Sequence, residues 1–296
     1  MPGAVKTYLF CGGLAFLLMA LGAAQGWAQT NPRDGLSPTF NEDFDNLLLR
    51  DGDEGVWSTT FPYEGVASRT LPSNRELQLY VDAAFAGLHD RPLGLNPFSV
   101  DNGVLSIAAV RAPRAVSRRM YGYRYASGML NTRESFTQTY GYFEIRARMP
   151  SGRGLWPAFW LLPADASWPP EIDVFEHLGR EPGTIYVAYH SSEAEGGAEP
   201  IDVETATTAF HTYAVLWSRD ELIWYIDDVE VRREATPEDM HEPMYMLVNL
   251  AIGGEWAGAP NRRTRFPARL EVDFIRAYAL GPPAGDGAGE GRPANN

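Results

Sequence analysis

The stretch WPPEIDVFEHLG, Trp168–Gly179, combines strand-forming residues with three acids. Its bulky apolar residues predict a β-strand that buries one face. Glu171 and Asp173 are two residues apart and therefore lie on the same side of that strand. Glu176, at an offset of five, points to the opposite and buried side, where an unpaired carboxylate is costly. Regular alternation therefore does not explain this sequence.

A β-bulge at Val174–Phe175 resolves the conflict, because one extra residue returns everything after it to the other face. The outer two acids then lie about 13 Å apart along the strand, and side chains that lean together bring their carboxyl groups to about 5–6 Å. This separation is typical of retaining glycosidases, and Asp173 between them can orient one glutamate and raise its pKa. A calcium site and a merely solvated acidic strand remain alternatives.

Aromatic residues lead into the acidic strand. The segment GYFEIRARMPSGRGLWPAFWLLP, Gly141–Pro163, places Trp156 and Trp160 four residues apart. Flat aromatic rings next to carboxylates are typical of a groove that binds sugars, whose apolar faces stack on rings. The alternative is that one of these two tryptophans belongs to the hydrophobic core.

The remaining chain reads as many short strands without a long helix after the amino-terminal region. Asp227 and Asp228 predict a hairpin turn inside one of these runs. Such a pattern predicts an all-β sandwich or barrel. The expected strands are Val104–Val110, Tyr140–Met149, Thr184–His190, His211–Trp217, Leu222–Arg233, Met244–Ile252 and Leu270–Leu280.

The two ends of the chain differ from its middle. Residues 1–28 carry Lys6, an apolar run and small residues before a cleavage site, which predicts a signal peptide and a secreted protein, periplasmic or extracellular. A membrane anchor is the alternative. Residues 29–38 are expected to be a linker, 39–280 the catalytic domain and 281–296 a disordered tail. Cys11 is the only cysteine and lies in the signal, so the mature chain has no thiol.

The formal net charge of −13 argues against nucleic acids and anionic membranes as partners. It also argues weakly against polyanionic substrates, unless a local basic groove exists. We expect a monomer that acts on a polysaccharide.

WPPEIDVFEHLG resembles the active-site strand of family 16 glycoside hydrolases, with the pattern Glu-x-Asp-x-x-Glu of the bulged branch. FNEDFDNL, YGYFEIRARMPSGRGLWPAFWLLP, FHTYAVLWSRDELIWYIDDVEVRR, PMYMLVNLAIGGEW and LEVDFIRAYA resemble other blocks of that family in their usual order. The resemblance implies a concanavalin A-like β-jelly-roll sandwich with an open cleft on its concave sheet. It implies Glu171 as nucleophile, Glu176 as acid/base and Asp173 as their assistant. It further suggests cleft positions for His190, Asn249 and Trp256, with core or turn roles as alternatives.

The same resemblance suggests a structural calcium ion on the convex side. Asp43, Gly103 and Asp273 match the usual ligand positions, although the common Asp-Glu-Phe block is Glu-Asp-Phe here. Carboxylates and carbonyls suit calcium. The chemistry itself requires no cofactor.

The expected activity is endo-hydrolysis, with retention, of β-1,3- or mixed-linkage β-1,3-1,4-glucan. A succinoglycan-like bacterial exopolysaccharide is the second substrate class. A non-catalytic glucan-binding module is the competing class of protein, and a transglycosylase would use the same two glutamates.

Overall fold

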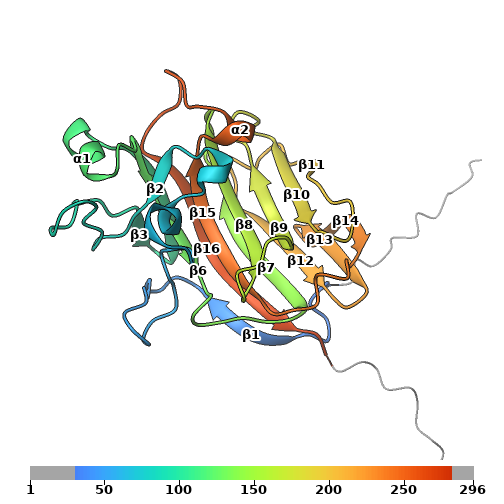
Figure 1. The fold of residues 1–296 in the computed structure, drawn as a ribbon. Helices are drawn as coiled ribbons and strands as arrows, with labels where there is room; N and C mark the ends of the chain where they lie inside the picture. Colours follow the sequence, from blue (N-terminus) through green and yellow to red (C-terminus); the bar gives the residue numbers. More distant parts are fainter. Residues whose placement is uncertain (1–30, 282–296) are drawn as a thin grey trace, which may run out of the picture. The chain divides into compact units, whose positions relative to one another are not determined.

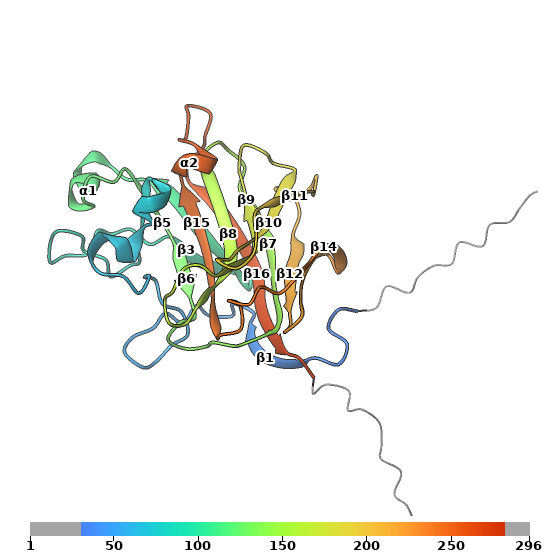
Figure 2. The same ribbon diagram turned by 45° about the vertical axis from the view of Figure 1, so that its right-hand side comes forward.

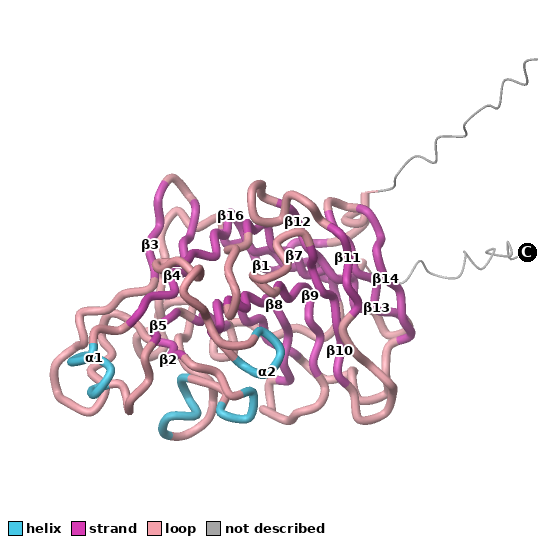
Figure 3. Tube along the Cα trace, turned by 90° about the horizontal axis from the view of Figure 1, so that it is seen from above, coloured by secondary structure: helices cyan, strands magenta, loops and turns pink. Residues whose placement is uncertain are grey.

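Two β-sheets stack face to face in the computed structural model, which describes residues 31–281 (Figures 1 and 2). The predicted signal peptide and nearly all of the predicted tail lie outside the described residues. Helical residues are confined to short pieces in the connections (Figure 3): η1 Gly65–Arg69, η2 Pro72–Asn74, α1 Arg114–Arg119 and α2 Gly254–Ala257. Within residues 31–281, no helix has the length and apolar character needed to cross a membrane.

The larger sheet has the strand order β14-β13-β12-β7-β16-β4-β5-β2, with β1 added beside β16 and β3 beside β4. Neighbours are antiparallel except for the parallel pair β2 and β5. Its strands are β1 Ser37–Glu42, β2 Gln78–Tyr80, β3 Phe98–Asp101, β4 Val104–Arg111, β5 Tyr125–Ser127, β7 Gly141–Arg148, β12 His211–Trp217, β13 Glu221–Ile226, β14 Val229–Ala235 and β16 Ala268–Ala279.

The smaller sheet has the order β11-β10-β9-β8-β15-β6 and is antiparallel throughout. Its strands are β6 Met129–Asn131, β8 Leu155–Pro163, β9 Glu171–His177, β10 Thr184–His190, β11 Glu199–Asp202 and β15 Met244–Ile252. The predicted β-jelly-roll sandwich is confirmed. Three expected strands, β10, β12 and β15, have the predicted bounds.

The main core fills the space between the sheets, as the alternation of apolar residues predicts. Phe143, Ile145 and Ala147 of β7 are fully buried in it and face the apolar side of the smaller sheet. A second buried cluster, which includes Trp160 and Tyr245, covers the opposite face of the smaller sheet. Because this sheet is covered on both faces, all residues of its strand β15 are buried. The cleft described below is built on this second face.

The hairpin turn between β13 and β14 forms at Asp227–Asp228, as predicted. Both residues have positive φ, 48° and 64°, which is the backbone of a type I′ turn. Aspartate adopts this left-handed region more readily than most residues other than glycine. The run Leu222–Arg233 is therefore two strands joined by this turn.

The ordered domain begins earlier than residue 39, which corrects the predicted boundary of the linker. Strand β1 starts at Ser37, and Arg33 before it donates to the carboxylate of Glu144 on β7 at 2.9 Å. Glu144 alternates with the core residues Phe143 and Ile145 and so lies on the other face of β7, yet it is fully buried, since Arg33 and the Tyr278 hydroxyl satisfy both of its oxygens. A segment that reads as polar linker thus covers part of the larger sheet.

Candidate active site

The predicted bulge is present in β9. On the β10 side, Asp173 pairs with Ala188 and Glu176 with Tyr186, so three steps on β9 match two on β10. On the β8 side the register also shifts between Asp173 and Phe175. Val174 and Phe175 are both buried in the core, whereas the acids before and after them face the other side. The extra residue therefore returns Glu176 to the face of Glu171 and Asp173.

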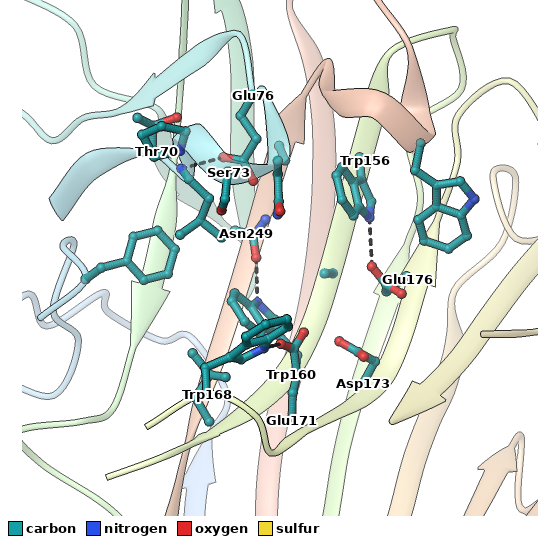
Figure 4. A pocket seen from close by; sticks show the side chains of 18 of the residues that line it. Thr70, Ser73, Glu76, Trp156, Trp160, Trp168, Glu171, Asp173, Glu176 and Asn249 are labelled. Carbon is teal, nitrogen blue, oxygen red and sulfur yellow. Dashed lines mark hydrogen bonds between the residues drawn. The ribbon is translucent and has the colours of Figure 1, made fainter. Parts of the chain in front are cut away.

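All three acids line a cleft of about 690 Å³ (Figure 4). Strand β9 supplies the acids and β8 supplies Trp156 and Trp160. Residues 61–80 form the opposite wall. The volume lies within the usual range for ligand sites. The arrangement offers several carboxyl groups and aromatic rings to one elongated ligand.

Each glutamate is held by the indole N–H of a tryptophan. Trp156 Nε1 donates to Glu176 Oε1 at 2.9 Å, and Trp168 Nε1 donates to Glu171 Oε2 at 2.6 Å. Figure 4 shows the first of these bonds as a dashed line between Trp156 and Glu176. These donors limit the rotation of the carboxyl groups and leave each with an oxygen that is free for chemistry. The two glutamates are thus oriented by separate residues.

Asp173 lies between the two glutamates with 1% of its surface exposed. Neither of its carboxylate oxygens has a hydrogen-bond donor among the residues that the structure describes. His190 Nε2 lies 3.6 Å from Asp173 Oδ2, and polar atoms of Glu171, Asp173 and His190 all lie within 4.8 Å of one another. A buried carboxyl in this position is stabilised when it carries a proton and donates it to a neighbouring carboxylate.

Burial raises the pKa values of all three acids, and repulsion between carboxylates adds to the rise for Asp173 and Glu176. Burial, followed by the charge of Glu171, raises the pKa of Glu176 to about 8 despite the Trp156 hydrogen bond. Burial also raises the pKa of Asp173 well above its usual range, with the charges of both glutamates adding to the effect. The pKa of Glu171 is raised by burial, while His190 and Trp168 oppose the rise. The environment favours a proton on Glu176, as a general acid needs, whereas His190 and Trp168 act against protonation of Glu171, as a nucleophile needs.

The predicted substrate-binding residues all line the cleft. His190 keeps 44% of its side chain exposed and is therefore not a core histidine. Trp160 is only 7% exposed, and its indole N–H donates to Asn249 at 2.7 Å. Asn249 in turn donates to the Tyr80 hydroxyl at 3.0 Å, so its amide mainly positions the cleft wall. Trp256 packs edge-on against Trp156, with ring centroids 5.6 Å apart.

Comparison with known proteins places this geometry in a family. The sequence model of Glycosyl hydrolases family 16 matches residues 94–276. The chain belongs to glycosyl hydrolase family 16. The family 16 chain is 48% identical over 251 residues to the endo-1,3-1,4-beta-glycanase ExsH of Rhizobium meliloti (strain 1021), covering 84% of this chain and 53% of that protein. It thus spans about half the length of that relative.

Two further relatives come from Rhodothermus marinus. A beta-glucanase of that organism is 35% identical over 260 residues, which cover 76% of the family 16 chain and 85% of the relative. The X-ray structure of its laminarinase superposes with a TM-score of 0.67 at 31% identity, covering 82% of this chain and 97% of that one. Sequence and structure therefore agree on the family.

Sequence reasoning missed several residues of the family 16 cleft. Trp168 was not assigned a role, although its place three residues before Glu171 was a usable signal. Glu76 was missed because it lies far away in the sequence; it is 7% exposed, and burial raises its pKa to about 6. It accepts hydrogen bonds from the backbone of Leu71 and from Gln78. Only the fold brings residues 61–80 across from the catalytic strand.

The predicted calcium ligands have other partners. The Asp43 carboxylate accepts from Arg276 and Asn41, and Asp273 is ion-paired with Arg146. Gly103 lies beside the backbone carbonyl of Asp43. A calcium ion would compete with two guanidinium groups for these oxygens, so the two side chains as they lie do not fit the site. The calcium ion stays a prediction, and no step of the chemistry depends on it.

The raised pKa of Glu176 predicts how stability varies with pH. Its carboxyl ionises near the usual 4.5 in the unfolded chain but near 8 in the fold, so the stability it provides is present below pH 4.5 and is lost as pH rises towards 8. The free energy of unfolding of Glu176→Gln, relative to that of wild type, should therefore increase by about 4–5 kcal/mol between pH 4 and pH 9, at 1.36 kcal/mol per pH unit. Denaturant unfolding at several pH values measures this difference.

The matched control is Glu193→Gln, which removes an exposed acid from the connection after β10. Its side chain is solvated in both states, so its stability difference from wild type should stay flat. A flat difference for Glu176→Gln as well would contradict the protonated state assigned to Glu176.

Proposed function

We propose that the chain is an endo-acting retaining glycoside hydrolase that cleaves β-1,3- or mixed-linkage β-1,3-1,4-glucan. The observation that carries the proposal is the bulged strand β9, which places Glu171 and Glu176 on one face, in the same cleft. The cleft supports internal cleavage, since it runs across strands and offers a long wall of rings. Membership of family 16 supports the reaction class.

The proposed mechanism is a double displacement. The Glu171 carboxylate attacks the anomeric carbon while Glu176 gives its proton to the glycosidic oxygen, so the C–O bond breaks and a glycosyl ester forms with inverted configuration. Glu176, now a carboxylate, takes a proton from water as the water oxygen attacks the same carbon. Glu171 leaves, and the original configuration is restored. Asp173 remains beside Glu171 and limits the build-up of negative charge by keeping its own proton.

Similar proteins support the choice of substrate. The relatives named above are an endo-1,3-1,4-beta-glycanase, a beta-glucanase and a laminarinase. The pair of glutamates and their tryptophan donors support an enzyme over a glucan-binding module, because binding alone does not need two oriented carboxyl groups. A succinoglycan-like exopolysaccharide is the second substrate class. Transglycosylation uses the same groups and is distinguished by its products.

The test is the release of reducing ends from laminarin, barley β-glucan, agarose and succinoglycan in parallel. We expect laminarin or barley β-glucan to be cleaved fastest, with a rapid fall in viscosity that indicates internal cuts. Products longer than the starting oligosaccharide would indicate transglycosylation. Binding of all four polymers without any new reducing end would contradict the proposed enzyme.

Secretion, the monomeric state and the independence from cofactors belong to the same proposal. The apolar amino-terminal run supports export, and mature protein should begin near Gln29 and lack a thiol. Gel filtration should give the mass of one chain. Activity should survive a chelator, since carboxyl groups alone supply the chemistry. An intact amino terminus on membrane-bound material would contradict the cleavage.

A further inference from the structure

Ion pairs are distributed unevenly over this acidic protein. Arginines on the larger sheet have acidic partners, such as Arg148 with Glu271 and Arg276 with Asp43. Two other segments contain no acid at all, residues 102–133 and 256–270. Within the described part of the chain, these arginines of the two segments form no ion pair: Arg111, Arg114, Arg118, Arg119, Arg124, Arg262, Arg263, Arg265 and Arg269.

The two segments meet in space. The rings of Tyr125 and Phe266 lie 5.2 Å apart, and the Arg111 guanidinium lies 5.3 Å from the first and 4.9 Å from the second. Arg269 on β16 pairs with Ala108 on β4, which lies within the first segment. We call these arginines the basic surface. Except for Arg119, which binds the carbonyls of Ala86 and Arg91, they are exposed.

Clustered arginines without acids repel one another, and an anionic ligand relieves this repulsion. The rest of the chain is acidic enough to give a net charge of −13, so the basic surface stands out locally. This net charge disfavours a polyanionic substrate unless a local basic groove exists. The basic surface supplies such a region.

The basic surface adjoins the catalytic cleft through a small hollow of about 270 Å³. Tyr121, Tyr123 and Arg124 line this hollow together with Glu76 and Leu77. Glu76 also lines the catalytic cleft, so the two depressions share a wall. Helix α1 comes shortly before residues 121–125, which line the hollow. Figure 1 shows α1 and β2 at the same side of the fold. A polysaccharide that leaves the cleft past Glu76 therefore reaches Arg124.

Tyr121 gives a second, independent sign of a ligand. It follows the end of α1 with φ of 53°, a left-handed backbone that a bulky residue adopts at a cost of about 1–2 kcal/mol. Its ring is nevertheless 47% exposed. Among residues 31–281, the other strongly exposed aromatic rings are Tyr63 and Trp168, and both line the cleft. Exposed rings in this protein accompany glycan-binding hollows.

We propose that the basic surface, with Tyr121 and Tyr123, binds carboxylate-bearing segments of the same polysaccharide chain that occupies the cleft. The inference rests on the proposed function and extends its substrates to β-glucans that carry acidic substituents. Guanidinium groups bind carboxylates through paired hydrogen bonds, and tyrosine rings stack on sugar faces. Nucleic acid is the less favoured ligand, since the surface continues into a cleft built for sugars and the remaining protein is acidic.

The test compares laminarin with laminarin carboxymethylated to a low degree, which share one backbone. For Arg118→Gln and for Arg124→Gln we expect KM on the carboxymethylated polymer to rise about five-fold, as for loss of one exposed ion pair, with kcat unchanged. KM on laminarin should change less than about two-fold. Wild-type KM should rise with NaCl only for the carboxymethylated polymer.

Arg219→Gln is the matched control, because Arg219 is an exposed arginine without an ion pair at the β12–β13 turn, outside the basic surface. It should change neither the KM on laminarin nor the KM on carboxymethylated laminarin. Equal effects of all three variants, or equal effects on both polymers, would overturn the proposal. Affinity electrophoresis in gels that contain each polymer measures binding through the basic surface even if the protein hydrolyses neither polymer. This measurement separates the present proposal from the catalytic one. Retardation by double-stranded DNA as strong as that by carboxymethyl laminarin would also overturn it.

Discussion

Glu171→Ala should lose hydrolysis of polysaccharide by roughly 10⁴-fold or more and should recover activity when azide or formate is added. The substitution removes the attacking carboxylate and leaves space below the anomeric carbon for a small anion. That anion attacks once, so the product has the inverted, α configuration. Proton NMR of the glycosyl azide measures the configuration directly.

The residues that surround Glu171 make this expectation specific to it. Because Trp168 holds its carboxyl, and His190 and Trp168 oppose the rise in its pKa that burial causes, Glu171 is the group prepared to attack. Trp168→Phe is a useful companion, since it removes the indole donor and keeps an aromatic ring; it should lower kcat and keep the fold. Rescue of Glu171→Ala with retained configuration would assign the nucleophile to Glu176 instead.

The second large effect concerns the proton donor. Glu176→Ala should lower the rate on polysaccharide by about 10²–10⁴-fold, the usual contribution of a general acid. Formation of the glycosyl ester should stay near normal on dinitrophenyl glycosides, whose leaving group needs no proton. Azide should then attack the ester and give a product with retained, β configuration. Pre-steady-state release of dinitrophenol measures the first step separately.

Asp173→Asn is the control for both glutamates. It replaces a protonated carboxyl group with an amide and removes no reacting atom, so it should lose less activity than either alanine variant. Full activity of both glutamate variants on polysaccharide would mean that these acids are structural. Opposite anomers on rescue would reverse the two roles.

The local pattern of residues was enough to predict the catalytic strand. Alternation of apolar side chains has a period of two, so the offset of Glu176 from Glu171 required one extra residue, and Val174 occupies that position in β9. The same periodicity predicted the faces of Phe143 and Ile145 and, with the absence of long helices, the sandwich. The hairpin at Asp227–Asp228 also followed from turn chemistry, which depends on neighbouring residues alone.

Tertiary structure decided what depends on contacts between distant segments. Arg33 buries Glu144 from 111 residues away, and Glu76 and Tyr80 reach the cleft because β2 is placed beside β5. The partners of Asp43 and Asp273 are arginines from other strands. The basic surface exists because two acid-free segments are joined at Tyr125 and Phe266. Periodicity and spacing describe one strand at a time, whereas pairing energies and desolvation arise only after strands far apart in sequence have packed together.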